Sequence, residues 1–166
     1  HSALIGLLGR QQVRNPRKAI RNLMKASDEG NSDASFILGL LYESNDYFQE
    51  NCETKNYQKA LEYFQKSGEQ GNSRGYQRIG YFYIAGLGVE KSKEKAKEYF
   101  EKAVELNDST AMNSLGSMYK DGLIDNKKNF EEAKRYYEMA EKLGDLTAAN
   151  NLGKLYYDGF LGKKDY

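Results

Sequence analysis

The sequence predicts an all-α fold of stacked antiparallel helix pairs, an α-solenoid, and three observations lead to that prediction. A nine-residue segment recurs along the chain, and the sixth residue of each copy is a glycine: Gly6, Gly39, Gly80, Gly116 and Gly153. A second segment, with two small residues seven positions apart, recurs in step with the first. The 166 residues include one proline and 16 glycines, a composition typical of helices separated by short glycine turns. Repeats of this length are the sequence signature of stacked helical hairpins.

The nine-residue segment is predicted to form the first helix of each unit. Its clearest copies are 34–42, 111–119 and 148–156, and weaker copies are 75–83 and 1–9. Apolar or small residues occupy the first, fifth, eighth and ninth positions, which form one face of a helix with a 3.6-residue turn. We expect these helices to end at Asn45, Gly86, Gly122 and Gly159, because Gly and Asn adopt the left-handed conformation at little cost.

The second recurring segment is predicted to form the second helix. Its small-residue pairs are Ala19 with Ala26, Ala60 with Ser67, Ala96 with Ala103, and Ala133 with Ala140. Four positions before the first residue of each pair stand favoured N-cap residues: Asn15, Asn56, Ser92 and Asn129. The ends are expected at Gly30, Gly71, Asn107 and Gly144, each followed by an Asn or Asp that is placed to cap the next unit.

The glycine inside each first helix is predicted to have a packing role. Glycine lowers helix propensity by about 1 kcal/mol relative to alanine, so its recurrence within a helix has a cost. Without a Cβ atom, two helices can cross closely at that point. Since one unit cannot bury its apolar stripe alone, stacked units are expected to share a continuous core.

The two patterns divide residues 1–166 into one solenoid segment of five units, at approximately 1–33, 34–74, 75–110, 111–147 and 148–166. The pattern opens without a preceding cap and stops where a fifth second helix would begin, so the last unit is truncated. We therefore expect the sequence to be a section of a longer solenoid.

Composition argues against several classes of function. The 25 basic and 24 acidic residues give a net charge of +1, which lacks the excess needed for nucleic-acid binding. No apolar stretch is long enough to span a membrane. A single cysteine, Cys52, and a single histidine, His1, leave no disulfide framework, no histidine-based metal site and no histidine-dependent catalysis inside the fold. We expect no catalytic residues, no metal and no cofactor.

The two recurring segments can be written together as Ala-x4-Gly-x2-Tyr-x2-Gly followed by x-Ala-x6-Ala-x3-Gly-Asn. This combined pattern resembles the Sel1-like repeat family, which is related to tetratricopeptide repeats. The segments Gly86-Leu-Gly-Val89 and Gly71-Asn72 match that pattern closely. The resemblance implies a right-handed α-solenoid that acts as a non-catalytic adaptor for a protein or peptide partner, as a subunit of a larger complex. The resemblance leaves an alternative open, in which the chain is a repeat segment of a larger enzyme-containing assembly and catalysis lies elsewhere. An endoplasmic-reticulum quality-control ubiquitin ligase is an example of such an assembly. The sequence assigns no compartment; we favour the cytosol, with the endoplasmic-reticulum lumen as the alternative.

The partner-binding surface is expected on the concave face, at the third, seventh and tenth positions of each first helix. These positions change in character between units, whereas the core positions repeat. They hold Phe36, Leu40 and Glu43; Gln77, Tyr81 and Ile84; Asn113, Ser117 and Lys120; and Asn150, Lys154 and Tyr157. We expect Phe36, Leu40, Tyr81 and Ile84 to form an apolar patch. The alternative is that neighbouring helices or the long loop of unit two cover Phe36 and Leu40.

The first 27 residues carry six basic side chains and no acidic one. Four of the six are arginines: Arg10, Arg14, Arg17 and Arg21. This basic end either meets an acidic partner or an upstream repeat, or forms ordinary solvated helix faces. The sequence does not decide between these two interpretations.

Overall fold

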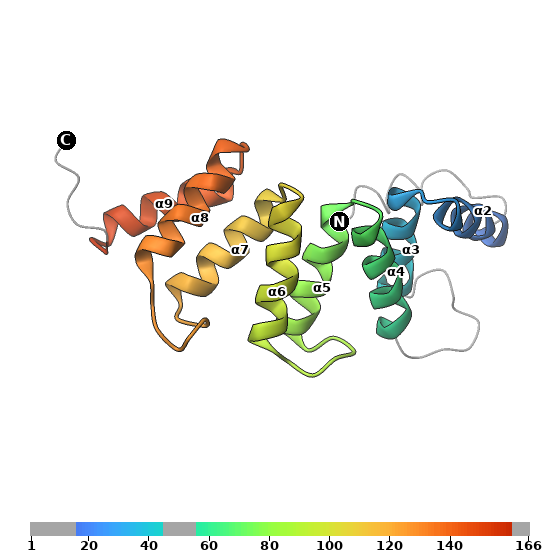
Figure 1. Cartoon of the computed structure of the whole chain (residues 1–166), viewed down its shortest axis with the longest axis horizontal. Coiled ribbons are helices and arrows are strands. Elements are labelled where there is room, and N and C mark those ends of the chain that lie inside the picture. The colour runs from blue at the N-terminus through green and yellow to red at the C-terminus, as the bar shows by residue number, and fades with distance from the viewer. Residues whose placement is uncertain (1–15, 45–55, 161–166) are drawn as a thin grey trace.

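The computed structural model describes residues 16–44 and 56–160 of the chain, and within these ranges it contains eight α-helices and no β-strand. The helices are α2 (Pro16–Asp28), α3 (Ser32–Ser44), α4 (Tyr57–Glu69), α5 (Ser73–Ala85), α6 (Lys93–Glu105), α7 (Ser109–Lys120), α8 (Phe130–Lys142) and α9 (Leu146–Tyr157). They follow one another in a row from α2 to α9 (Figure 1). The prediction of an all-α repeat fold is confirmed for this part of the chain. The expected first helix at 1–9, the caps Asn15 and Asn45, and both His1 and Cys52 lie outside it.

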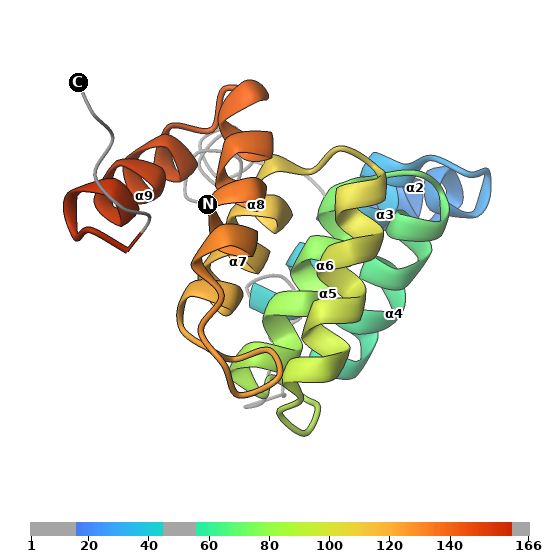
Figure 2. The ribbon, with the colours of Figure 1, turned by 60° about the vertical axis from the view of Figure 1, so that its left-hand side comes forward.

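Antiparallel pairs are the building units of the row. The most extensive contacts join α3 to α4, α5 to α6 and α7 to α8, and each pair then packs against the helix that follows it in the sequence. Helices α4 and α6 lie in front of α3 and α5 in Figure 1, and the turned view of Figure 2 shows the same succession along the chain. Helices that are consecutive in sequence are therefore neighbours in space, as in a solenoid.

The predicted caps stand where the helices begin. The side-chain oxygens of Asn56, Ser92 and Asn129 accept hydrogen bonds from backbone N–H groups three residues later, at 3.1, 3.2 and 3.1 Å. Asp108 and Asp145 cap α7 and α9 in the same way, at 2.8 and 3.0 Å. The predicted turn residues have positive φ angles: Gly30, Gly71, Gly86, Asn107, Gly122, Gly144 and Gly159. Local sequence therefore fixes both ends of nearly every described helix.

Aromatic rings on the second helices fill the centre of each pair. Phe64, Phe100 and Tyr137 are at most 3% exposed. A Cβ atom on Gly39, Gly80 or Gly116 would lie 2.5 to 2.6 Å from the nearest atom of the corresponding ring. The glycine lets the ring lie directly against the backbone of the first helix, which confirms the predicted packing role in these three units.

A pair of stacked tyrosines recurs beside each of these rings. Its ring centroids are 5.5, 5.8 and 5.7 Å apart in units two, three and four, and the pairs are Tyr42 with Tyr63, Tyr83 with Tyr99, and Tyr119 with Tyr136. Each pair joins the first helix of a unit to its second helix. Offset stacking of this kind adds to the stabilisation that area burial provides.

Gly116 and Gly153 offer a matched test of the packing role, because no atom of the described residues lies within 4 Å of a Cβ atom built on Gly153. Gly153→Ala should raise the free energy of unfolding by about 1 kcal/mol through helix propensity alone. Gly116→Ala should lower it by about 1 to 2 kcal/mol, because the buried Tyr137 ring cannot yield to the new methyl group. Urea denaturation followed by circular dichroism measures both. The same sign of change in the two variants would contradict the close-packing explanation.

Candidate protein-binding face

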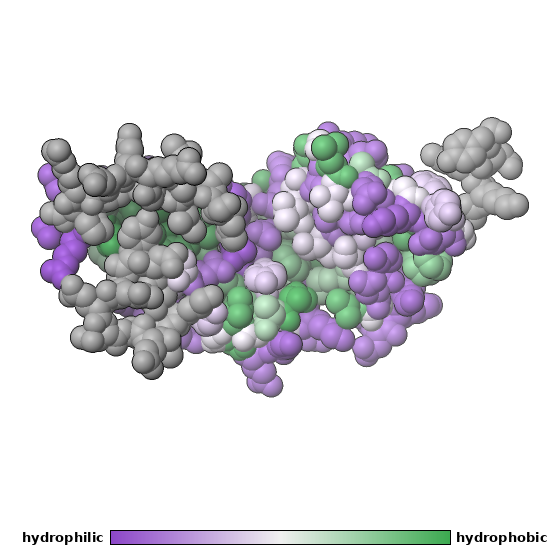
Figure 3. Space-filling model, turned by 180° about the vertical axis from the view of Figure 1, so that it is seen from behind, coloured by the Kyte–Doolittle hydropathy of each residue, from purple (hydrophilic) through white to green (hydrophobic). Residues whose placement is uncertain are grey.

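We call the third, seventh and tenth positions of the recurring segment in α3, α5, α7 and α9 the first-helix face. These are the twelve positions that the sequence proposes for partner binding. Figure 3 views the molecule from behind; where grey atoms do not cover it, hydrophilic and hydrophobic residues are mixed. The residues of this face divide into those that support the fold and those that are available to a partner.

Phe36 is not an exposed binding residue, and the prediction for it is wrong. Its side chain is 7% exposed, its ring centroid lies 5.6 Å from that of Phe64, and it belongs to the core cluster of units two and three. The Arg74 guanidinium of the next unit lies 4.5 Å from the ring centroid. The alternative interpretation, that neighbouring helices cover Phe36, is the correct one.

The expected apolar patch is reduced to a single well-exposed residue. Leu40 and Ile84 are half-buried and pack against the two core clusters. Tyr81 is 43% exposed, and the Arg78 guanidinium lies 5.1 Å from its ring centroid. An aromatic ring held by a cation while one side meets solvent is a typical anchor for a protein partner.

Glu43 forms an ion pair with Arg78, which joins α3 to α5. The two side chains are 17% and 14% exposed, so much of the pair is removed from solvent. Among the residues that the structure describes, Glu43 Oε2 and Arg78 Nε find no hydrogen-bond partner. The Arg78 guanidinium also lies 5.9 Å from the ring centroids of Phe64 and Phe82. Arg78 is not among the residues predicted from the sequence; its only signal there is a charge one position after Gln77 of the predicted face.

Further polar contacts join consecutive first helices. Arg74 Nη2 lies 3.1 Å from Asp33 Oδ1, joining α5 to α3, and Asn151 Nδ2 donates to Asn113 Oδ1 at 2.9 Å, joining α9 to α7. The Ser73 hydroxyl donates to the Asp108 carboxylate at 2.8 Å, which links the starts of α5 and α7. Asn113 is therefore already engaged by the next unit.

The predicted residues of α7 are partly engaged within their own unit. The hydroxyls of Ser117 and Tyr137 lie 3.0 Å apart, and Lys120 Nζ lies 3.4 Å from Asp121 Oδ1. Burial raises the pKa of Tyr137, although the hydrogen bond to Ser117 acts in the opposite direction. Ser117 and Lys120 thus contribute to local structure as well as to the face.

The predicted residues of α9 are the most accessible. Asn150 and Lys154 are exposed, and Tyr157 is 91% exposed. Gln77 on α5 is half-buried. Together with Tyr81, these residues form the available part of the first-helix face.

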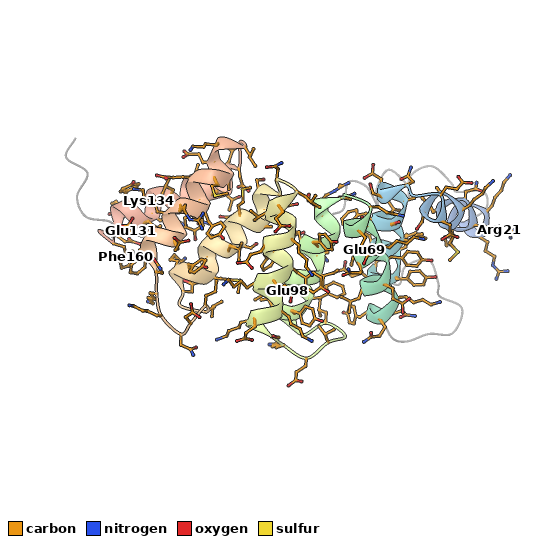
Figure 4. All side chains as sticks on the ribbon, in the orientation of Figure 1. Arg21, Glu69, Glu98, Glu131, Lys134 and Phe160 are labelled. Atoms are coloured by element: carbon orange, nitrogen blue, oxygen red, sulfur yellow. The ribbon has the colours of Figure 1, made fainter. Side chains whose placement is uncertain are left out.

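The basic end is described only in part. Arg17 and Arg21 are exposed on α2, and Figure 4 places Arg21 at the end of the row of helices. Arg10 and Arg14 lie outside the described residues. At the same end, Lys66 Nζ of α4 contacts Asp28 Oδ1 at 2.7 Å and Lys25 Nζ lies 3.8 Å from Glu29 Oε1, so two acids adjoin the basic end.

Over 16–44 and 56–160, no group of three or more His, Cys, Asp or Glu side chains is placed to hold a metal ion. No helix within the same ranges has the length and apolar character of a membrane span.

The Sel1 repeat family model matches the sequence at 3–31, 32–72, 73–108, 109–145 and 146–166. These five matches cover nearly the whole chain. The chain belongs to the Sel1 repeat family. Each of the last four Sel1 matches starts two residues before the unit boundary expected from the sequence, at the first residue of α3, α5, α7 or α9.

Solved Sel1-type structures have the same fold. A Sel1 repeat protein from Oxalobacter formigenes has a TM-score of 0.77 at 30% identity, with 91% of this chain and 59% of that one covered. The antigen c5321 of uropathogenic Escherichia coli has a TM-score of 0.76 at 30% identity, with 92% of this chain and 31% of that one covered. Helicobacter pylori cysteine rich protein B has a TM-score of 0.59 at 30% identity, with 82% of this chain and 94% of that one covered.

Among curated proteins, the sequence is similar to the ERAD-associated E3 ubiquitin-protein ligase component HRD3 of Candida glabrata. The two are 38% identical over 73 residues, which is 44% of this chain. This chain spans 8% of the length of that protein. Sel1 repeats generally mediate interactions between proteins, and the family is generally a non-catalytic scaffold.

The two ion pairs between α3 and α5 should differ in strength. A double-mutant cycle with Glu43→Ala and Arg78→Met should give a coupling free energy of about 1 to 3 kcal/mol. The reason is that removal of either side chain leaves the other charge largely buried and unpaired. The exposed pair, tested with Asp33→Ala and Arg74→Met, should give less than about 1 kcal/mol. Urea denaturation of the wild type, the four single variants and the two double variants measures both cycles. Equal coupling would show that the buried pair does not hold the two units together.

Proposed function

We propose that this chain is a non-catalytic scaffold that binds a protein or peptide partner on its first-helix face, within a larger complex. The observation that carries the proposal is the contrast between repeated core residues and variable face residues. The fifth position holds Leu38, Ile79, Leu115 and Leu152, all buried. The seventh position, on the first-helix face, holds Leu40, Tyr81, Ser117 and Lys154. A surface that varies on a constant framework is suited to one specific partner.

The accessible side chains of this face favour a polypeptide ligand. Gln77 and Asn150 carry amides that both donate and accept hydrogen bonds, and so match the N–H and C=O groups of an extended backbone. Tyr81 and Tyr157 add two aromatic surfaces that could pack against side chains. A highly charged non-protein ligand is less suited, since Arg74, Arg78 and Lys120 are paired with acids and Lys154 is the one other cation among the twelve positions.

A second candidate function is a repeat segment of an endoplasmic-reticulum quality-control ubiquitin-ligase assembly, in which catalysis belongs to another subunit. The similarity to the Candida glabrata ligase component supports this candidate. It would place the chain in the lumen rather than in the cytosol. Proximity labelling with the full-length protein, followed by identification of labelled ligase subunits, tests it. Labelling of cytosolic proteins alone would contradict it.

Photo-crosslinking tests the proposed face. A benzophenone amino acid at Gln77 or Lys154 of the full-length protein should crosslink to one common partner in its native cells. The same group at Glu98 or Glu131, which lie on the second helices α6 and α8 (Figure 4), should not. Tyr81→Ala should reduce the crosslink yield at Lys154 by about fivefold or more, because exposed aromatic anchors contribute strongly to binding.

The same variant supplies the control for folding. Because Tyr81 is 43% exposed, Tyr81→Ala should leave the helical circular dichroism signal unchanged. A partner that crosslinks only from Glu98 and Glu131, or a yield unaffected by Tyr81→Ala, would overturn the proposed binding face.

A further inference from the structure

Helix α9 carries an open side that contains Leu146, Gly153 and Tyr157, which we call the α9 docking face. The spacing of seven and four positions places the three residues on one side of the helix. Leu146 is 83% exposed and Tyr157 is 91% exposed, and no atom of the described residues lies within 4 Å of a Cβ atom built on Gly153. The two most exposed large apolar side chains of the described residues therefore flank a stretch of bare backbone.

The other units show what a glycine at this position of the repeat contacts. In units two, three and four a ring from the second helix lies directly on the glycine: Phe64 on Gly39, Phe100 on Gly80 and Tyr137 on Gly116. The local sequence around Gly153 is the same, with Leu152 before it and Tyr156 three positions after it. The backbone at Gly153 is therefore suited to receive a ring, and no ring of the described residues lies on it.

Tyr157 is the side chain that can supply such a ring. Three aromatic side chains are exposed among the described residues, and two of them are already engaged. The Arg78 guanidinium lies 5.1 Å from the ring centroid of Tyr81, and the rings of Phe160 and Phe130 are stacked with their centroids 4.3 Å apart. The ring of Tyr157 has no contact of either kind within the described part of the chain.

The neighbouring Tyr156 has a different role. The ninth position of the other units carries a tyrosine that stacks on the second helix, and in unit five Lys134 Nζ of α8 lies 5.8 Å from the Tyr156 ring centroid. Tyr156 is therefore turned toward α8, whereas Tyr157 is turned to solvent. Helix α9 is the last described helix of the row, with α8 along one side of it (Figures 1 and 2).

The glycine and the free ring belong to the same helix, one turn apart, so the α9 docking face is complementary to itself. When two α9 helices pack antiparallel about a two-fold axis between these residues, Tyr157 of each copy meets Gly153 of the other. An isologous interface uses the same surface on both copies in this way. Helices α4, α6 and α8 of a second copy cannot replace α9, because their rings are buried inside their own units.

We propose that the α9 docking face is a self-association surface, on which a second copy of this chain packs antiparallel with its Tyr157 ring on Gly153. This inference goes beyond the proposed function, which concerns a different protein. One helix from each copy buries less than the about 1,200 Å² of total surface that is typical of stable complexes, so the dimer should be weak and reversible. Dimer formation withdraws Tyr157 from the first-helix face and leaves Tyr81 as its exposed aromatic residue.

Sedimentation equilibrium of the 166-residue chain, from micromolar to millimolar concentration, tests the dimer. Gly153→Ala should raise the dissociation constant by about tenfold or more, because a new methyl group lies under both rings. The same substitution should stabilise the single chain through helix propensity, so weaker association would not reflect unfolding. Thr147→Ala is the matched control: it is exposed on another side of α9, also raises helix propensity, and should leave the dissociation constant unchanged.

Variants of the ring complete the experiment. Tyr157→Ala should also raise the dissociation constant by about tenfold or more, whereas Tyr157→Phe keeps the ring and should change it by less than about threefold. Tyr81→Ala removes the other well-exposed tyrosine and should have no effect on self-association. In a mixture of ¹³C-labelled and unlabelled chain, an isotope-filtered nuclear Overhauser effect should join the Tyr157 ring to the Hα atoms of Gly153 in the second copy.

Four outcomes would overturn the inference. They are a chain that stays monomeric at millimolar concentration, association that Gly153→Ala leaves unchanged, equal losses in the variants and their matched controls, and intermolecular contacts that come only from other helices. Self-association of the full-length protein that does not respond to Tyr157→Ala, as expected when another segment or a partner covers α9, would also overturn it. Crosslinking from Gln77 with Tyr81→Ala concerns α5, so failure of the dimer and failure of the proposed function remain distinguishable.

Discussion

The architecture depends on the direct contact between an aromatic ring and the backbone of the helix that precedes it. Gly39, Gly80 and Gly116 permit that contact because no Cβ atom stands between ring and backbone. The ring then fixes the distance between the two helices of a unit. The stacked tyrosines and the small residues of the second helix pack at that same distance. A low helix propensity at one position is thus exchanged for dense packing across the whole pair.

The same packing separates the constant part of the molecule from the variable part. Buried positions accept only residues that fit the fixed helix spacing, whereas the first-helix face and the inter-helix loops do not have to meet that requirement. Tyr81 on α5 and Tyr157 on α9 are examples of exposed side chains that the core packing leaves unconstrained. One framework therefore carries side chains of different chemistry from unit to unit.

The sequence predicted the features that depend on nearby residues. The caps Asn56, Ser92 and Asn129 act on N–H groups three residues away, so their role is visible in a short window. Phe36 was misassigned because its environment is set by Phe64 and by Arg74 of the next unit, about 30 and 40 positions later. Helical periodicity locates an apolar stripe but not the angle at which the next unit covers its border.

The contacts that the sequence missed are equally non-local. The pairing of Glu43 with Arg78 requires the relative rotation of α3 and α5. The cleft of about 860 Å³ between the α5–α6 loop and the α7–α8 loop requires loops from different units to lie side by side. Neither follows from a repeat pattern, because the pattern describes what units share. The side chains that give this chain its own surface are the ones in which the units differ.

Each helix makes its main contacts only with its neighbours in the sequence, and this has a consequence for how the molecule opens. A perturbation in one hairpin reaches a distant hairpin only through every interface between them, as in a linear chain of coupled elements. Amide protection against hydrogen exchange should therefore be graded along the rod rather than uniform. A ligand that bridges two adjacent hairpins would act as a staple at that junction and would leave remote junctions as they were.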